Sequence, residues 1–208
     1  MRRAPALEQL AIDFESCPPR WRFSRLALRS RYRERIRERL EFVRGFFPEL
    51  DGITVRVGLV RKAGVLGWGS LHPEHPGVWV RPRRLDAFTI AHEFTHLLQA
   101  RGLVPRGERA CDLWALARSP LLVDRSPGYL RVPLRLRHQR ELPPRDAALL
   151  HRAAADALRA RERGERNYLR RFERGLELAE RERTAPEPAT DRPTALIQAL
   201  GFARARRA

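Results

Sequence analysis

The chain has 208 residues, of which 43% are hydrophobic and 32% charged, and its formal net charge is +17. This length suits one domain, or a small domain with an appendage, and excludes two large domains. The composition excludes a disordered protein, no stretch approaches the roughly 18 apolar residues of a membrane span, and the start lacks the apolar core of a signal peptide, so we expect a soluble cytoplasmic protein.

The first part of the chain predicts a lead-in followed by one amphipathic helix. Residues 1–24 contain several prolines and no clean period, and we expect them to be irregular. Ile36, Leu40 and Val43 then recur at helical spacing among arginines and glutamates, which predicts a helix over about 25–44. Its apolar stripe must pack on another part of the fold.

Three short strands are expected next. Apolar residues alternate over 53–60, which is typical of a half-buried strand. A second strand is expected at 65–71, where Gly67 and Gly69 flank a tryptophan, and a third at 77–81. The small number of strands predicts a small sheet.

Two helices follow the strands. The segment 87–100 is apolar enough to lie inside the protein, and Asp86 precedes it as an expected cap. A second helix is predicted at 108–118, because Ser-Pro stops the pattern there. Residues 119–144 are rich in proline, and we expect extended chain that follows the surface.

The C-terminal part is predicted to be helical and then irregular. Residues 146–183 are rich in Ala, Leu, Glu and Arg and predict a long helix, broken near Gly164. Residues 184–208 begin with a proline-rich stretch that has the composition of a linker, and end in a tail.

The residues that point to chemistry lie in the helix 87–100. His92, Glu93 and His96 form the pattern His-Glu-x-x-His. Residues four apart project from the same side of a helix, so two imidazoles converge on one metal ion while Glu93 lies beside them. The alternative is two core histidines and a surface glutamate, but unpaired polar groups are costly in a buried helix.

A third ligand is expected from the next helix, since a catalytic zinc ion takes three protein ligands and leaves one position open. Glu108 and Asp112 are again four apart, so Glu108 could bind the metal while Asp112 accepts a hydrogen bond from a ligating histidine. The alternatives are a Glu108 that only stabilises the start of its helix, or ligation by Asp112 or Cys111. The ordinary interpretation of the other histidines is surface or turn residues, namely His72, His75, His138 and His151.

At these positions the chain resembles the gluzincin metallopeptidases, in which the two-histidine helix is followed by a glutamate helix with the pattern Gly/Asn-Glu-x-x-x-Asp. The match is residue for residue at His92, Glu93, His96, Gly107, Glu108 and Asp112. The resemblance covers about residues 25–118. One departure is the short gap, because Gly107 follows His96 by only eleven residues; helix and loop lengths still permit the contact.

The resemblance implies an α+β, zincin-like fold with a small twisted sheet, an active-site helix and a glutamate helix. It also implies a catalytic zinc ion held by His92, His96 and Glu108. The composition of the rest of the chain adds a helical C-terminal extension, so we expect an irregular lead-in, a catalytic domain, a helical extension, and a linker with a tail, at 1–24, 25–145, 146–183 and 184–208.

A zinc endopeptidase acting on peptide or protein substrates is therefore the leading hypothesis. Glu93 would take a proton from the attacking water and give it to the leaving amine. Tyr129 and His138 are candidates to stabilise the oxyanion, although ordinary packing also explains Tyr129. Related enzymes align the substrate on an edge strand, which would here contain Gly67, Trp68 and Gly69; those glycines also fit a β-bulge.

Two other functions remain open: a metalloprotease associated with DNA, suggested by the positive charge, and a catalytically silent regulatory or binding protein. All but one of the 42 basic residues are arginines, and they are spread along the chain, which favours a solvated surface over a nucleic-acid partner. The two cysteines, Cys17 and Cys111, do not make a disulfide framework or a closed cysteine zinc site.

Overall fold

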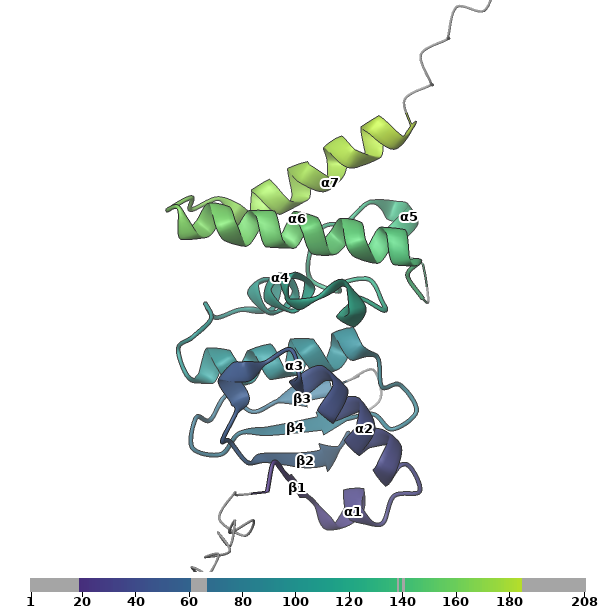
Figure 1. The fold of residues 1–208 in the computed structure, drawn as a ribbon, viewed down its shortest axis with the longest axis vertical. Coiled ribbons are helices and arrows are strands. Elements are labelled where there is room, and N and C mark those ends of the chain that lie inside the picture. The colour runs from purple at the N-terminus through teal and green to yellow at the C-terminus, as the bar shows by residue number, and fades with distance from the viewer. Residues whose placement is uncertain (1–18, 61–66, 138, 140, 185–208) are drawn as a thin grey trace, which may run out of the picture.

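The structure, a computed structural model, describes residues 19–60, 67–137, 139 and 141–184. Within this part of the chain, seven α-helices and one four-stranded sheet form a mixed α+β fold, which confirms the expected class. Figure 1 shows the sheet toward one end of the molecule, with α3 (Ala87–Ala100), α4 (Glu108–Arg118) and α6 (Pro144–Glu162) following it in that order. The helices thus build outward from the sheet in layers.

The sheet consists of three parallel strands and one antiparallel edge strand. Its spatial order is β1 (Trp21–Phe23), β2 (Val55–Leu59), β4 (Gly77–Val80) and β3 (Gly67–Gly69). Side chains alternate between the two faces of a strand, and the valines on the face toward the helices are buried: Val55, Val57, Val78 and Val80. This face of the sheet forms one side of the core.

Two expectations for the N-terminal part are wrong. Trp21–Phe23 forms β1, where we expected irregular chain, because it pairs with the distant strand β2. The expected helix 25–44 is two helices, α1 (Arg25–Leu28) and α2 (Arg33–Arg44). The hydroxyl oxygen of Ser30 accepts a hydrogen bond from the N–H of Tyr32 at 3.2 Å, and this local contact competes with the helical pattern between them.

The helices α3 and α4 have the bounds that the sequence predicts, but the cap of α3 is different. Asp86 occupies the position before the helix, and its side chain makes no capping hydrogen bond. The carboxylate of Asp124 accepts instead from the N–H groups of Ala87 at 2.6 Å and Phe88 at 3.0 Å, and it also pairs with Arg39 at 2.8 Å. A side chain far along the chain therefore caps the helix.

We expect Asp124→Ala to lower the free energy of unfolding by about 2 kcal/mol, because two N–H groups lose their acceptor and Arg39 loses its partner. Urea unfolding at pH 7 measures this change. Asp124→Asn is the matched control, since it keeps an acceptor oxygen but not the charge, and its loss should be smaller. Unfolding curves that coincide for all three proteins would contradict the assigned cap.

The segment after α4 does not simply follow the surface, as we expected. It contains a 3₁₀ turn, η2 (Pro120–Leu122), and a short helix, α5 (Leu134–Arg137). Its apolar side chains join the hydrophobic core: Leu122, Val123, Leu130, Val132, Leu136 and Leu142. The prolines prevent long helices here, yet the apolar residues between them still bury their side chains.

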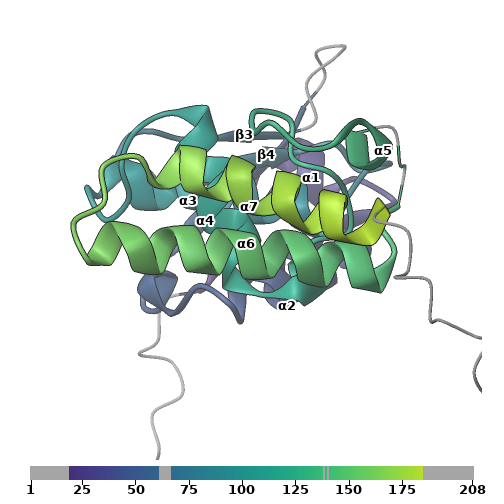
Figure 2. The same cartoon turned by 90° about the horizontal axis from the view of Figure 1, so that it is seen from above.

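The predicted C-terminal helix is broken near Gly164, as expected, and forms α6 and α7 (Tyr168–Thr184). Figure 2 shows these two helices side by side, with α4 beneath them. The side chains of Leu150, Ala154 and Ala157 on α6 are buried, as are Phe172 and Leu176 on α7. Both helices are therefore part of the same core. Of the predicted linker and tail, residues 185–208 lie outside the described residues.

An ion-pair cluster joins α5 to the last two helices. The guanidinium of Arg135 donates to Asp146 on α6 at 2.8 Å and to Glu180 on α7 at 2.7 Å. The hydrogen bond from Arg135 lowers the pKa of Glu180 from 4.5 to about 2. Since this pKa is depressed in the fold, its contribution to stability is present above about pH 4.5 and is lost as the pH falls toward 2.

Arg135→Ala should lower the free energy of unfolding at pH 7 by about 2 kcal/mol, because two carboxylates lose a charged donor. The difference from the parent should shrink as the pH falls from 4.5 toward 2, where Glu180 becomes protonated in both proteins. Thermal unfolding over this pH range measures it. Arg152→Ala, at an exposed position of α6, is the control. An equal loss of stability in both variants, or a loss in Arg135→Ala that does not change with pH, would refute the role of the cluster.

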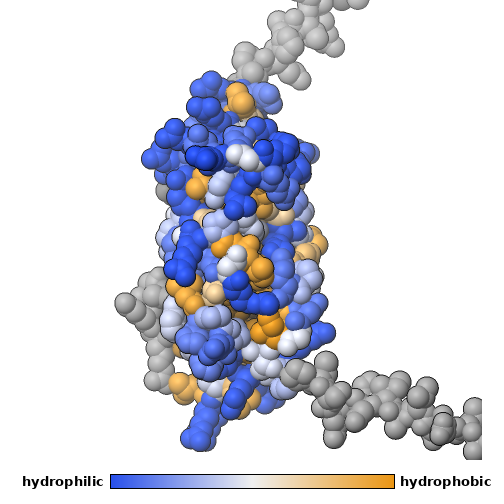
Figure 3. All heavy atoms as spheres, turned by 90° about the vertical axis from the view of Figure 1, so that its left-hand side faces the viewer, coloured by the Kyte–Doolittle hydropathy of each residue, from blue (hydrophilic) through white to orange (hydrophobic). Residues whose placement is uncertain are grey.

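The hydropathy of the outer surface varies along the molecule. Figure 3 shows hydrophilic residues over the end formed by α6 and α7, while hydrophobic residues gather level with α3 and α4. Among the described residues, no helix has the length and apolar character needed to cross a membrane.

Candidate metal centre

Two helices place three potential ligands around one point. His92 and His96 lie one turn apart on α3 and face α4, whose first residue is Glu108. The Nε2 atoms of the two rings lie 3.0 and 3.4 Å from the same atom, Oε2 of Glu108. The short loop between the helices therefore does bring Glu108 to both histidines.

The far nitrogen of His92 is fixed by Asp112. Its Nδ1 lies 2.8 Å from Oδ1 of Asp112, whose side chain is buried on α4. The other carboxylate oxygen of Asp112 accepts from the N–H of Tyr129 at 2.6 Å. Burial alone lowers the pKa of His92, but the hydrogen bond and the charge of Asp112 outweigh it, so the pKa is raised overall.

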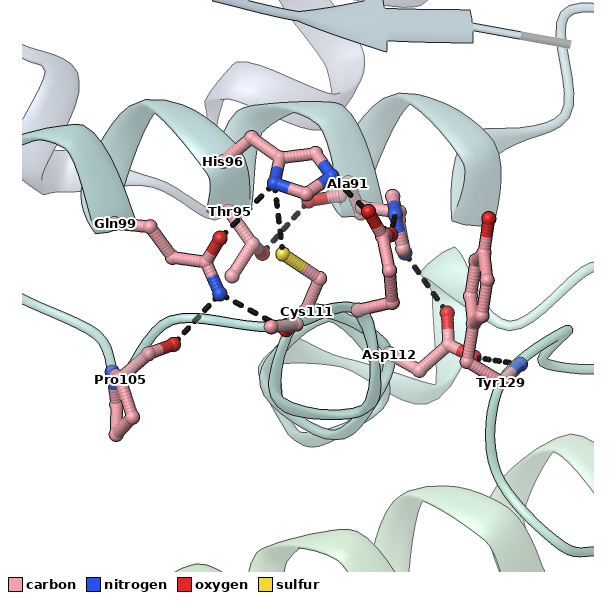
Figure 4. Close-up of polar contacts among 11 residues, drawn as sticks. Ala91, Thr95, His96, Gln99, Pro105, Cys111, Asp112 and Tyr129 are labelled. Atoms are coloured by element: carbon pink, nitrogen blue, oxygen red, sulfur yellow. Dashed lines mark hydrogen bonds and ion pairs between the residues drawn. The ribbon is translucent and has the colours of Figure 1, made fainter. Parts of the chain in front are cut away.

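The far nitrogen of His96 is fixed by Gln99, which the sequence analysis did not single out. The amide Nε2 of Gln99 donates to the carbonyl oxygens of Pro105 at 2.6 Å and Gly107 at 3.0 Å. Its Oε1 must then accept from Nδ1 of His96 at 3.0 Å, as Figure 4 shows. Burial lowers the pKa of His96, which favours the neutral ring.

These hydrogen bonds decide what the site fits. Asp112 and Gln99 accept from the two Nδ1 atoms, so each ring in its neutral form directs an Nε2 lone pair at Glu108, itself an acceptor. Three electron-pair donors facing one another repel unless a cation or a proton lies among them. Two imidazole nitrogens and one carboxylate oxygen are a donor set that suits a divalent transition metal.

Cys111 offers a second arrangement that is less suitable. Its Sγ lies close to His92 and His96, but its contact is with Nδ1 of His96 at 3.2 Å, on the ring edge that already faces Gln99. Burial also raises the pKa of the Cys111 thiol, which disfavours the thiolate that binds metals. Glu108 is thus the better placed third ligand.

Glu93 follows His92 directly on α3 and lies beneath the edge strand β3. A Cβ atom on Gly67 would lie 2.6 Å from the Glu93 carboxylate, and one on Gly69 would lie 2.8 Å from Cβ of His96. The glycines therefore let β3 cross directly over α3. The bulge interpretation is wrong, because Gly67 to Gly69 pair with β4 in continuous register.

The environment of Glu93 favours a carboxyl group that holds its proton. Burial, which leaves the residue only 6% exposed, raises its pKa from 4.5 to about 7. The charge of His92 and a hydrogen bond from the N–H of Gly69 act in the opposite direction, and neither cancels the effect of burial. A group with a pKa near neutrality can both accept and release a proton.

An open pocket of about 500 Å³ lies beside His92 and Glu93. Tyr129 lines it, with its ring stacked on His92 at a centroid distance of 5.7 Å and 55% of the residue exposed. Trp68 points away from Glu93, since side chains alternate along β3. Of the other candidates, His138 lies outside the described residues.

The remaining histidines lie elsewhere. His151 hydrogen-bonds the carbonyl oxygen of Leu116 at 2.9 Å. His72 and His75 are exposed, as expected, and lie beside Glu74 in a separate cluster of donor atoms.

No family model, curated protein or solved structure matched this chain.

The contacts of Gln99 predict that it orients a ligand. Gln99→Ala should weaken zinc binding about 10- to 100-fold, because His96 loses the acceptor that fixes its tautomer and the loop before Glu108 loses two hydrogen bonds. Competition with a chromogenic chelator measures the affinity. Gln99→Glu is the control, since it keeps the acceptor for His96 and gives up the loop contacts. Parent-like affinity in both variants would rule out the role.

Proposed function

We propose that this chain is a zinc-dependent endopeptidase of the gluzincin type. The observation that carries the proposal is the convergence of two Nε2 atoms on one oxygen of Glu108, with both far nitrogens fixed by acceptors. His92, His96 and Glu108 would hold the metal. A structural cluster of two core histidines would not need acceptors on both edges of each ring.

Glu93 would act as the general base. A bound zinc ion would polarise the carbonyl of the scissile peptide and make a nearby water molecule more acidic. Glu93 takes a proton from the water molecule as the water oxygen attacks the carbonyl carbon. It then gives that proton to the amine nitrogen as the C–N bond breaks. Its near-neutral pKa in the buried site suits both transfers.

The substrate would lie along β3. This strand is at the edge of the sheet and passes directly over α3, which carries Glu93. An extended peptide can add to such an edge through backbone hydrogen bonds. Tyr129, which lines the pocket beside His92, is the residue we propose to stabilise the oxyanion through its hydroxyl group.

Metal content and proteolysis together test the function. The purified protein should contain one zinc ion per chain and should cleave unfolded casein; a chelator should abolish cleavage, and added zinc should restore it. Protein that binds no zinc would refute the proposal. Zinc bound at one per chain without cleavage of any unfolded protein would support the catalytically silent binding protein instead.

A further inference from the structure

The face of the sheet that points away from the helices has an unusual composition. Each described strand contributes its outward residues, which are Arg22 on β1, Arg56 and Gly58 on β2, Gly77 and Trp79 on β4, and Trp68 on β3. No outward residue of the four strands carries a negative charge. We call these six residues the outer sheet face.

The two tryptophans form an aromatic platform on this face. The indole of Trp79 lies so close over the sheet that a Cβ atom on Gly58 would be 2.2 Å from it, and one on Gly77 would be 3.0 Å away. The glycines thus allow the ring to lie flat. Trp68, the cross-strand partner of Trp79, packs against it with a centroid distance of 4.5 Å.

Sheet stability explains only part of this arrangement. A cross-strand aromatic pair stabilises a sheet, which accounts for Trp79, partly buried over the two glycines. Trp68 remains 57% exposed although it is a large apolar residue on an edge strand. An exposed aromatic surface of this kind is typical of a binding site.

Positive charge adjoins the platform. Arg22 and Arg56 are exposed and lie opposite each other across β1 and β2. Arg56 pairs in turn with Gly77, two residues before Trp79 on β4, so the arginines lie in the row next to that of the tryptophans on the same face. The guanidinium of Arg56 donates to the carbonyl oxygen of His75 at 2.9 Å, which holds its side chain on this face. The whole chain, at +17, adds a field of the same sign.

We propose that the outer sheet face binds single-stranded nucleic acid. Aromatic rings on which bases stack, next to arginines that contact phosphates, are the two components of sequence-tolerant single-strand binding. Bases would stack on Trp68, and Arg22 and Arg56 would contact the backbone. The hydrogen-bonding side chains that these strands offer on this face, the arginines and the two indoles, are all donors, and none can accept from the O–H of a ribose, so DNA and RNA should bind alike.

This site is independent of the candidate metal centre, because Glu93 and both metal-facing histidines lie on the other side of the sheet's layer, on α3. The two proposals can therefore fail separately. If both hold, the second site would bring the peptidase to proteins that are bound to single strands.

Fluorescence anisotropy of labelled ten-nucleotide oligothymidine, titrated with the full chain, tests the proposal. We expect saturable binding that weakens with salt, oligouridine affinity within about threefold, and weaker competition by duplex DNA and heparin. Trp68→Ala should weaken binding about tenfold and Trp68→Phe should restore most of it, because phenylalanine keeps a stacking face. Thermal unfolding verifies that each variant is folded.

The arginines need a control of equal charge. The double variant Arg22→Gln, Arg56→Gln should weaken binding and reduce its salt dependence more than Arg163→Gln, Arg166→Gln, which removes the same charge at the turn after α6. Equal losses from the two pairs, no effect of Trp68→Ala, or equal affinity for duplex DNA would overturn the proposal. Absence of oligonucleotide binding would do so as well, and would leave a protein segment as the occupant of this face.

Discussion

Glu93→Gln is expected to reduce peptide hydrolysis by at least about 100-fold while leaving zinc binding intact. Glutamine has nearly the same shape as glutamate, but its amide cannot take a proton from the attacking water. The buried site disfavours the charge of Glu93, as its pKa of about 7 indicates, so the variant should be at least as stable as the parent in the absence of metal. Lost activity could then not be attributed to unfolding.

Initial rates of casein cleavage, zinc content and melting temperature measured on the same preparation check this prediction. The matched control is Glu34→Gln, a substitution of the same kind at an exposed position of α2, which should leave all three quantities unchanged. Cleavage at the parent rate by Glu93→Gln would show that another group serves as the base, or that a contaminating protease was being measured.

Glu108→Ala should weaken zinc binding by more than about 100-fold, the upper end of the effect of losing an outer partner of a ligand. The side chain of Glu108 is 46% exposed, so its loss should cost little stability by itself. The remaining histidines would hold the metal without a compensating negative charge. Activity should fall with the metal content and recover in part at high zinc concentration.

Cys111→Ser decides between the two possible third ligands. The thiol contacts Nδ1 of His96 and not the point where the two Nε2 atoms meet Glu108, so this variant should bind zinc within a few-fold of the parent. Equilibrium dialysis against a zinc buffer measures both variants. The reverse result, in which Glu108→Ala binds zinc like the parent and Cys111→Ser binds it more weakly, would identify Cys111 as the third ligand.

Local patterns predicted the helices that carry the site and the spacing on each. The bounds of α3 and α4 follow from residues within those segments, and spacing by four residues put Glu108 and Asp112 on one face of their helix. From the sequence, only the length of the loop between the two helices could be used to judge whether Glu108 reaches His96. That length permits the contact, but it also permits many other courses of the chain. The distance of 3.4 Å between them is a property of the folded chain.

The features that sequence analysis missed all depend on contacts between distant segments. Asp124, which follows α4 in the chain, caps α3. The sequence around Asp86 gives no sign that Asp86 itself does not cap this helix. Strand β1 is too short for an alternating pattern and exists because β2 accepts it. The position of Gln99, three residues after His96 on the same helix, could have suggested its contact with that histidine. Its hydrogen bonds to carbonyl oxygens of the following loop could not have been predicted from the local sequence.

The helix α4 carries Glu108 and Asp112 on the side toward α3, while its other side packs against α6. Leu113 and Leu116 of α4 are fully buried, as is Leu150 of α6. In an excised segment 25–118, the leucines of α4 would be exposed to water, and the helix that carries the proposed third ligand would be loosened. Any event that lifts the C-terminal helices away, such as proteolytic nicking or a competing partner, would therefore change the affinity of the proposed site for a metal without altering any of its proposed ligands.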